Sequence, residues 1–444
     1  MNCDQARTEI IAYLKGELDA EKKQRLEEHL ARCPACRHEL EGARRLLSWT
    51  EAASEEAVVK AVEQMIDSGI RGGASDIHVE PQRDGELLIR QRVDGVLHEV
   101  SRFDSVMRHG IVNRIKMMAG MDTSETSIPQ DGRIPWKLEG DDKEYDMRVS
   151  CQPFVHGEGF VMRILDRSSV MIGLDKLGFY EDQMNALLEI ASEPSGLLLL
   201  SGPTGSGKTT TAYSLLHHIV TPEIKVLTVE DPVEYQLTGT NQVQVHKKAG
   251  LTFATALRSF LRHDPDIIYI GEMRDLETAS IAIEAAITGH LVITSLHTND
   301  AIQTFVRLVD MGVDPFLISA TLIGAVAQRL VRNVCKACKT EVPRDELSPA
   351  MKYFGITEDD LRSHTIFRGQ GCDTCRKTGY RGRTGIFEVL KVDKELASMV
   401  VDRPPLRELL EAARAKGFRT MREDARRKVL DGMTTPEEAL RVLV

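Results

Sequence analysis

Residues 202–209, Gly-Pro-Thr-Gly-Ser-Gly-Lys-Thr, limit more than any other stretch how this chain can fold. An apolar run at 197–200 precedes them, as expected for a buried strand, and residues 210–220 follow without Gly or Pro, as expected for a helix. Glycines let backbone N–H groups curl around phosphate oxygens, and a helix N-terminus adds partial positive charge. A strand, a glycine-rich turn and a helix start predict a P-loop, and therefore a nucleotide-binding protein. A glycine-rich turn that arose by chance is disfavoured, because the pattern and its setting coincide.

Within the P-loop, two side chains have expected roles toward ATP. Lys208 can reach the β- and γ-phosphates, and the hydroxyl of Thr209 can hold Mg²⁺. The predicted nucleotide-binding residues are Gly202, Pro203, Thr204, Gly205, Ser206, Gly207, Lys208, Thr209 and Thr210.

The bulk composition excludes several classes of protein. The chain has 444 residues, enough for about two to four domains. Its hydrophobic fraction of 42% and charged fraction of 28% are typical of soluble globular proteins. A net charge of −10 argues against a general nucleic-acid binder, which should be basic. No apolar stretch approaches the ~18 residues of a membrane span, and no secretory signal is visible, so a cytoplasmic protein is expected.

Six of the eight cysteines fall into C-x-x-C pairs, which favours metal binding over disulfides. Two pairs predict one structural zinc site with four thiolates and no open coordination position; its ligands are Cys335, Cys338, Cys372 and Cys375. Cysteines without metal are the alternative. Cys151 is left over and is expected to be a small buried apolar residue.

The first forty residues predict a small helical module that is stabilised by metal. Asp19 can cap a helix that continues toward Cys33, so His29 and Cys33 share one helical face. Cys36 and Cys3 complete a set of one His and three Cys, which suits a second structural zinc. A helical hairpin with free thiols is the alternative. This stretch resembles the zinc-binding N-terminal module of anti-sigma factors, which implies a protein-binding module.

The next region, residues 58–165, predicts an α+β domain with no function evident from its composition. Its expected elements are a helix at 58–68, strands at 76–79, 86–93 and 96–100, a helix at about 105–118, and strands near 146–150 and 160–165.

Acidic residues follow two apolar strands of the nucleotide domain. The strand at 224–229 ends at Glu230, and the strand at 267–270 ends at Gly271-Glu272. Acidic groups at the carboxyl end of a strand beside a P-loop lie where Mg²⁺ or the attacking water is handled. Glu272 and Glu230 are therefore candidate bases or water-orienting groups, and the sequence does not decide between them.

Basic and imidazole side chains add further candidates. Arg258 and Arg262 lie four residues apart on one helical face, either as a solvated basic face or as arginine fingers that a neighbouring subunit can supply. His290 and His297 flank the strand at 291–295. Either is a structural residue or a sensor of the γ-phosphate through one hydrogen bond.

Taken in order, the motifs resemble those of one family, the secretion ATPases of type II secretion and type IV pilus assembly. The matching segments are SDIHVEP at 75–81, GPTGSGKTT at 202–210, VEDPVEY at 229–235, GEMRD at 271–275, TGHLVITSLHTNDA at 288–301, the four zinc cysteines and TGYRGRTGIFEVL at 378–390. The resemblance implies a homohexamer with ATP between a smaller domain and a RecA-like domain. It also implies that Arg148 and Arg163 reach the nucleotide from the smaller domain, and that Arg258 and Arg262 act across the subunit interface.

The predicted fold class is α/β, a RecA-like P-loop core preceded by a PAS-like α+β domain. The expected order is a zinc module at 1–40, a linker at 41–57, the α+β domain at 58–165, a linker at 166–180, the RecA-like domain at 181–332, a tetracysteine insert at 333–385 and a helical region at 386–444.

By this resemblance the chain is expected to be a cytoplasmic hexameric ATPase that works on an inner-membrane platform protein, without binding nucleic acid. Two alternatives stay open. One is a regulatory binding protein that uses nucleotide as a switch through its anti-sigma-like module. The other is a pilus-retraction motor, which the tetracysteine insert disfavours.

Overall fold

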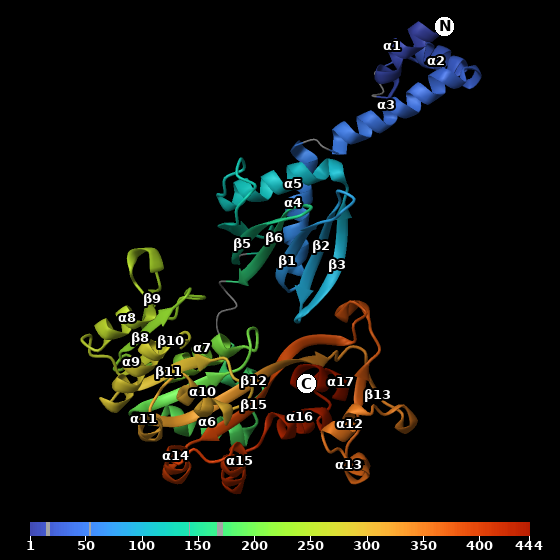
Figure 1. The fold of residues 1–444 in the computed structure, drawn as a ribbon. Coiled ribbons are helices and arrows are strands. Elements are labelled where there is room, and N and C mark those ends of the chain that lie inside the picture. The colour runs from blue at the N-terminus through green and yellow to red at the C-terminus, as the bar shows by residue number, and fades with distance from the viewer. Residues whose placement is uncertain (15–17, 53–54, 142, 167–171) are drawn as a thin grey trace. The chain divides into compact units, whose positions relative to one another are not determined.

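The computed structural model describes residues 1–14, 18–52, 55–141, 143–166 and 172–444 (Figure 1). The chain divides into two compact units, Met1–Ser168 and Ser169–Val444, and each is described by itself.

Three helices make up the N-terminal part: α1 (Cys3–Leu14), α2 (Ala20–Arg32) and α3 (Pro34–Ala52). Asp19 accepts a hydrogen bond from the Lys22 N–H at 2.9 Å, which confirms the predicted start of α2. Among the described side chains, Ala6, Leu26, Leu30 and Cys36 form one small buried core cluster. So small a core contributes little to the free energy of folding, and a bound metal ion would supply much of it.

The predicted connector at 41–57 is helical where the structure describes it. Helix α3 continues to Ala52, and α4 (Glu55–Arg71) begins three residues later; residues 53–54 lie outside the described residues.

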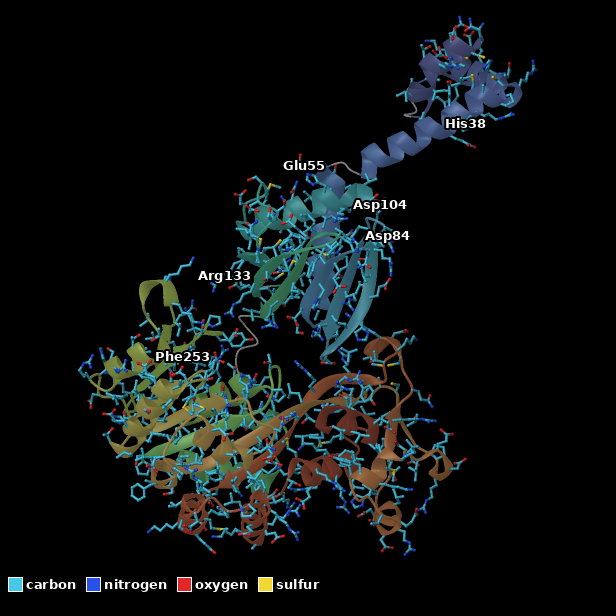
Figure 2. The ribbon with its side chains drawn as sticks, in the orientation of Figure 1. His38, Glu55, Asp84, Asp104, Arg133 and Phe253 are labelled. Carbon is cyan, nitrogen blue, oxygen red and sulfur yellow. The ribbon has the colours of Figure 1, made fainter. Side chains whose placement is uncertain are left out.

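An antiparallel sheet of six strands, in the order β3-β2-β1-β6-β5-β4, forms the rest of the first unit. The strands are β1 (Ala74–Pro81), β2 (Leu87–Val93), β3 (Val96–Phe103), β4 (Gln130–Lys137), β5 (Glu144–Phe154) and β6 (Gly157–Asp166). Helices α4 and α5 (Ser105–Ala119) pack on one face, and Asp104, labelled in Figure 2, caps α5. The predicted helices and strands of this region are confirmed. Strand β4 was not predicted, because Gly132 and Pro135 interrupt its pattern; Pro135 is tolerated since β4 is an edge strand.

The second unit is built on a sheet of seven strands in the order β15-β12-β7-β11-β10-β8-β9. Its strands are β7 (Gly196–Ser201), β8 (Val226–Glu230), β9 (Thr240–Gln244), β10 (Ile267–Ile270), β11 (Leu291–Leu296), β12 (Leu322–Val334) and β15 (Tyr380–Lys391). All neighbours are parallel except β12 and β15. Leu197 and Leu199 enter one core and Leu198 and Leu200 the other, which explains the continuous apolar run of β7.

Helices cover both faces of this sheet and form the C-terminal region (Figure 1). The helices of this unit, with those of the insert included, are η1 (Leu174–Lys176), α6 (Glu181–Ala191), α7 (Lys208–Ile219), η2 (Lys247–Ala249), α8 (Phe253–Phe260), α9 (Leu276–Ile287), α10 (Gln303–Asp310), α11 (Pro315–Thr321), η3 (Arg344–Glu346), α12 (Ala350–Tyr353), α13 (Glu358–Ser363), η4 (Asp373–Cys375), α14 (Lys394–Val401), α15 (Leu406–Ala415), α16 (Met421–Leu430) and α17 (Pro436–Leu443).

Secondary structure crosses two of the predicted domain boundaries in this unit. Strand β12 continues past residue 332 to Val334, and residues 386–391 belong to β15 rather than to a helix. Residues 386–390 are all buried, because both faces of the sheet are covered. A strand buried on both faces is apolar at nearly every position, so it shows no alternation that would distinguish it from a helix. The helices begin at Lys394.

Of the predicted linker at 166–180, residues 167–171 lie outside the described residues, and Leu174 is buried in the core.

A buried ion pair ties the C-terminal helices to the sheet. Lys428 Nζ lies 2.5 Å from Asp424 Oδ2 within α16, and both side chains are fully buried. Asp424 also accepts hydrogen bonds from the Phe387 N–H of β15 at 2.9 Å and from Gln183 Nε2 of α6 at 3.0 Å. Burial raises the pKa of Asp424 and lowers the pKa of Lys428, and the attraction between the two opposes both shifts.

Replacing Lys428 by Met should leave the Asp424 carboxylate buried without its cation. We expect the free energy of unfolding to fall by about 3–5 kcal/mol, because an unpaired buried charge is strongly destabilising. Differential scanning calorimetry of the full chain would detect this as a lower melting temperature. Lys416→Met is the control, since Lys416 pairs with Glu395 at the surface, 2.7 Å apart, where a pair contributes about 1 kcal/mol or less. Equal melting temperatures of the two variants would contradict the expectation.

Candidate nucleotide site and metal centres

The P-loop connects β7 to α7, as predicted, and its glycines are required by its backbone. Gly207 precedes the first residue of α7 with φ of 92°, and Gly202 has φ of 147°. A Cβ atom at Gly202 would lie 2.6 Å from the Gln328 carbonyl oxygen, so a side chain there would collide with β12. The backbone N–H groups of this turn and of the first turn of α7 can therefore approach a phosphate closely.

Two polar groups of the P-loop fit a phosphate ligand. The ammonium of Lys208 donates to the carbonyl oxygens of Gly202 at 2.7 Å and Pro203 at 3.1 Å. The hydroxyl of Ser206 is buried and has no hydrogen-bond partner among the described residues. Because a buried hydroxyl is normally hydrogen-bonded, Ser206 has capacity for a phosphate oxygen.

The environment of Lys208 lowers its pKa to about 8, mainly through burial, while nearby Glu272 acts in the opposite direction. The phosphates of a nucleotide would add negative charge beside this ammonium and would raise its pKa again.

Strand β12 holds the P-loop through residues that the sequence analysis did not single out. Gln328 Nε2 donates to the Ser206 carbonyl oxygen at 2.7 Å. The next residue, Arg329, donates to the Asn299 carbonyl oxygen at 3.1 Å, in the loop after β11. The signal in the sequence is the polar pair Gln328-Arg329 inside the otherwise apolar run 322–331 of β12.

Glu272 and His297 lie together near Lys208. Strands β10 and β11 are parallel neighbours, so the residues that follow them meet at the same edge of the sheet as the P-loop. His297 Nε2 is 3.9 Å from Glu272 Oε2, and Arg274 Nη2 is 2.7 Å from Glu272 Oε1. Burial and the charge of Lys208 lower the pKa of His297, while Glu272 opposes the shift. This arrangement brings an ammonium, a carboxylate and an imidazole to one edge.

Glu230 has a different environment. It is 2% exposed, and its carboxylate accepts hydrogen bonds from the hydroxyls of Tyr213 and Thr228 and from Gln242 Nε2 at 3.1 Å. Burial raises its pKa, and these donors oppose the shift. Its oxygens are therefore engaged by the protein, whereas Glu272 is partly accessible.

His290 does not lie at the nucleotide edge, and the expectation that it could sense the γ-phosphate is wrong. It precedes the first residue of β11, while the P-loop follows the last residue of the parallel neighbour β7. Its Nδ1 is 2.8 Å from the Ala285 carbonyl oxygen at the end of α9. His290 therefore caps a helix.

Arg258 and Arg262 are exposed and adjacent. Helix α8, which begins at Phe253 (labelled in Figure 2), carries Arg258, and Arg262 lies just past its end. Arg262 Nη1 donates to the Arg258 carbonyl oxygen at 2.8 Å, and Arg258 Nη2 donates to Glu277 at 2.6 Å. Both guanidinium groups are thus held at the surface.

A row of arginines crosses the first unit's sheet on the face opposite α4 and α5. Arg148 of β5 is directly opposite Arg163 of β6, and Arg163 Nε donates to Asp76 of β1 at 3.0 Å. Arg133, labelled in Figure 2, is opposite Arg148 on β4 and was not predicted. The alternation of side chains along each strand puts these residues on one face.

The tetracysteine group has the geometry of a tetrahedral metal site. Its four sulfurs lie within 4.8 Å of one another, with Cys335–Cys372, Cys338–Cys375 and Cys372–Cys375 separated by 3.9, 3.8 and 3.7 Å. Four sulfurs at ~2.3 Å from a tetrahedral zinc are ~3.8 Å apart. A disulfide would need ~2.05 Å, so the group fits zinc and not disulfides.

The N-terminal group also comes together. The ligand atoms of Cys3, His29, Cys33 and Cys36 lie within 4.8 Å of one another. Cys3 and Cys33 are 3.8 Å apart at their sulfurs, and His29 Nε2 is 3.3 Å from Cys36 Sγ. Three sulfurs and one imidazole in this arrangement fit a closed zinc site. Cys151 is buried, as predicted, in the core of the first unit's sheet domain.

A parallel sheet that presents a P-loop, a glutamate and a histidine at one edge defines a P-loop ATPase. A family model described as "Type II/IV secretion system protein" matches residues 51–441, and one described as "Putative zinc-finger" matches residues 3–37. The chain therefore belongs to the type II/IV secretion ATPase family.

Individual relatives agree with this assignment. The chain is 46% identical over 386 residues to the type IV pilus assembly ATPase PilB of Thermus thermophilus, covering 87% of this chain but 43% of that protein. It is 44% identical over 392 residues to type II secretion system protein E of Pseudomonas aeruginosa, covering 88% and 76%. The chain thus spans less than half of the Thermus relative.

Solved structures share the fold. The pilus retraction motor PilT with bound ADP is 26% identical, with a TM-score of 0.57 over 85% of this chain and 95% of that one. The ATPase DotB of Legionella pneumophila, 22% identical, has a TM-score of 0.61 over 85% and 94%. Within the described part of the chain, every helix is too short or too polar to cross a membrane.

Each tetrad should bind one zinc ion. We expect Cys36→Ser and Cys375→Ser each to lower the zinc content by one ion per chain, because a closed site needs all four ligands. Elemental mass spectrometry of each purified variant would measure its zinc content per chain. Cys151→Ser is the matched control, and equal zinc in all three variants would contradict the assignment.

Nucleotide affinity should depend on pH through Lys208. Its pKa of about 8 lies below the value expected with phosphate bound, so binding takes up a proton above about pH 8 and the affinity then falls with pH. We expect the Kd of ADP to rise about tenfold between about pH 8 and pH 9.5, as measured by titration calorimetry. In Lys208→Arg the cation does not titrate, so an unchanged pH dependence in that variant would assign the effect elsewhere.

Proposed function

We propose that this chain hydrolyses ATP to drive assembly of a type IV pilus or of the pseudopilus of a type II secretion system. The observation that carries the proposal is the grouping of Lys208, Glu272 and His297 at the P-loop edge. The 44–46% identity to pilus assembly and type II secretion relatives supports the cargo class. A cytoplasmic homohexamer, docked on an inner-membrane platform protein, is the form that the family resemblance implies.

In this proposal residues 202–210 bind the polyphosphate of ATP. The Lys208 ammonium and the N–H groups of the P-loop neutralise the β- and γ-phosphates. Thr209, at the start of α7, would hold Mg²⁺, which adds charge neutralisation at the reacting phosphoryl group.

Glu272 is the proposed base or water-orienting group. Its carboxylate is partly accessible at the sheet edge, and His297 lies beside it where a γ-phosphate can be sensed. Glu230 is the weaker candidate, since Tyr213, Thr228 and Gln242 already occupy its oxygens. Glu230 then maintains the position of β8 and α7.

Two pairs of arginines complete the proposed site in the hexamer. Arg258 and Arg262 are exposed and anchored to each other, as suits fingers offered to the nucleotide of an adjacent subunit. Arg148 and Arg163 lie directly opposite each other on the sheet face away from α4 and α5, where two neighbouring guanidinium groups suit an anionic ligand. We propose that both pairs neutralise charge that develops on the γ-phosphate.

The cysteine groups are proposed zinc sites with structural roles. The N-terminal module, with Cys3, His29, Cys33 and Cys36, is a candidate docking element for a protein partner. A nucleotide-switched regulator is one alternative for a chain with this module, and a pilus-retraction motor, which the tetracysteine group disfavours, is the other. Steady ATP turnover by the purified chain without a partner would argue against a switch.

Replacing Glu272 by Gln should lower kcat by about 10²–10⁴-fold, because the amide cannot take a proton or orient water in the same way. ATP affinity should change little, since the P-loop is intact. Release of phosphate and binding of a fluorescent nucleotide measure the two quantities.

The controls for this experiment are Glu230→Gln and Glu284→Gln. Glu284 is exposed on α9, so its variant should keep the activity of the unchanged chain. If Glu272→Gln keeps more than half of kcat while Glu230→Gln loses it, the base is Glu230 and the assignment is reversed.

A further inference from the structure

Glu388 is a buried acid in the middle of strand β15, where burial is costly. It is 4% exposed, between the apolar residues Phe387 and Val389. Burial raises its pKa to about 7. An ionised carboxylate persists in such a place only if it is well hydrogen-bonded.

The two carboxylate oxygens of Glu388 are used by two different segments. Oε2 accepts the Ala301 N–H at 2.8 Å, and Oε1 accepts the Met421 N–H at 2.8 Å. Ala301 belongs to the loop after β11, and Met421 is the first residue of α16. A helix N-terminus favours a carboxylate, which helps to stabilise the charge.

The loop that Glu388 holds also carries the proposed phosphate sensor. His297 lies four residues before Ala301, with Glu272 3.9 Å away. Thr298 lies between His297 and Ala301 in the sequence. Its carbonyl oxygen accepts a hydrogen bond at 2.9 Å from the hydroxyl of Ser201, the last residue of β7. Arg329 of β12 fixes the Asn299 carbonyl oxygen at 3.1 Å. The loop is thus attached on one side to the strand that enters the P-loop and on the other to Glu388.

The second partner of Glu388 leads into the C-terminal helices. Thr420 and Glu423 form a capping box at the start of α16, which fixes the position of the Met421 N–H. One turn further, Asp424 is held by the Phe387 N–H of β15, next to Glu388. A movement of the loop after β11 therefore acts on a helix end that has little freedom of its own.

We infer that Glu388 is a positioning residue that couples the loop of His297 to helix α16. Through it, nucleotide binding at the P-loop edge changes the stability of the C-terminal helices, and those helices set the position of His297. The inference rests on the proposed ATPase function for its kinetic consequence, but not for the coupling itself.

Glu388→Gln tests the inference because it keeps the size of the side chain and replaces one acceptor by a donor. The amide NH₂ would face a backbone N–H, so one of the two bonds is lost. We expect kcat to fall about 10–100-fold, since small misplacements of catalytic groups have effects of this size, and KM to change less than about threefold. The side chain in Glu388→Asp is shorter and can reach one partner, so the kcat of this variant should lie between that of the unchanged chain and that of Glu388→Gln.

Glu438→Gln is the matched control. Glu438 is also fully buried and accepts a backbone N–H, that of Arg332 at 3.1 Å. It also pairs with two arginines, Arg332 of β12 and Arg441 of α17, and both lie outside the loop of His297. This variant should lower the melting temperature at least as much as Glu388→Gln and keep kcat within about threefold. Loss of kcat in both variants to the same extent would overturn the positioning role.

Hydrogen exchange read by mass spectrometry tests the coupling separately from catalysis. In the full chain, the non-hydrolysable analogue AMP-PNP should slow exchange in peptides that cover 297–303 and 419–430. In Glu388→Gln only the first peptide should respond, whereas in Glu438→Gln both should. If 419–430 is unaffected in the unchanged chain, the coupling is absent. If both peptides respond but no chain hydrolyses ATP, the proposed function fails and the coupling stands.

Discussion

The parallel sheet of the second unit is buried on both faces, and this constraint determines where polar chemistry can be placed. Strands β7, β8, β10 and β11 offer apolar side chains to both cores, so charged groups gather where the strands end. Because the strands are parallel, their carboxyl ends meet at one edge. The P-loop, Glu272 and His297 are together for this reason.

Three glutamates of this unit show how burial separates roles among identical side chains. Glu272 is partly accessible and pairs with Arg274. Glu230 is buried and engaged by side chains of α7, β8 and β9. Glu388 is buried and engaged by two backbone N–H groups. Of the three, Glu272 alone is partly accessible to a substrate or a water; the other two are buried and stabilised by donors that the protein itself supplies.

The cysteine groups address a different problem, the lack of apolar residues in small segments. Among their described side chains, the N-terminal helices share only a small buried core, and the segment between β12 and β15 has only short strands and helices of its own. In both, four ligand atoms converge from positions that are distant in sequence. A metal at such a point links segments that hydrophobic contacts would hold weakly.

The sequence by itself determined the local features. The strand, turn and helix of the P-loop, the cap at Asp19 and the pairs of cysteines depend on neighbouring residues, and the structure agrees with each. The tertiary structure decided the surroundings of each candidate. His290 lies at a helix end, and Glu230 is enclosed by hydrogen-bond donors. Gln328 contacts the P-loop, and Glu388 contacts the loop after β11. These outcomes depend on partners that lie far along the chain, such as Ala301 for Glu388. Burial and hydrogen bonding between distant segments exist only once the sheet has formed, so no pattern of neighbouring residues encodes them.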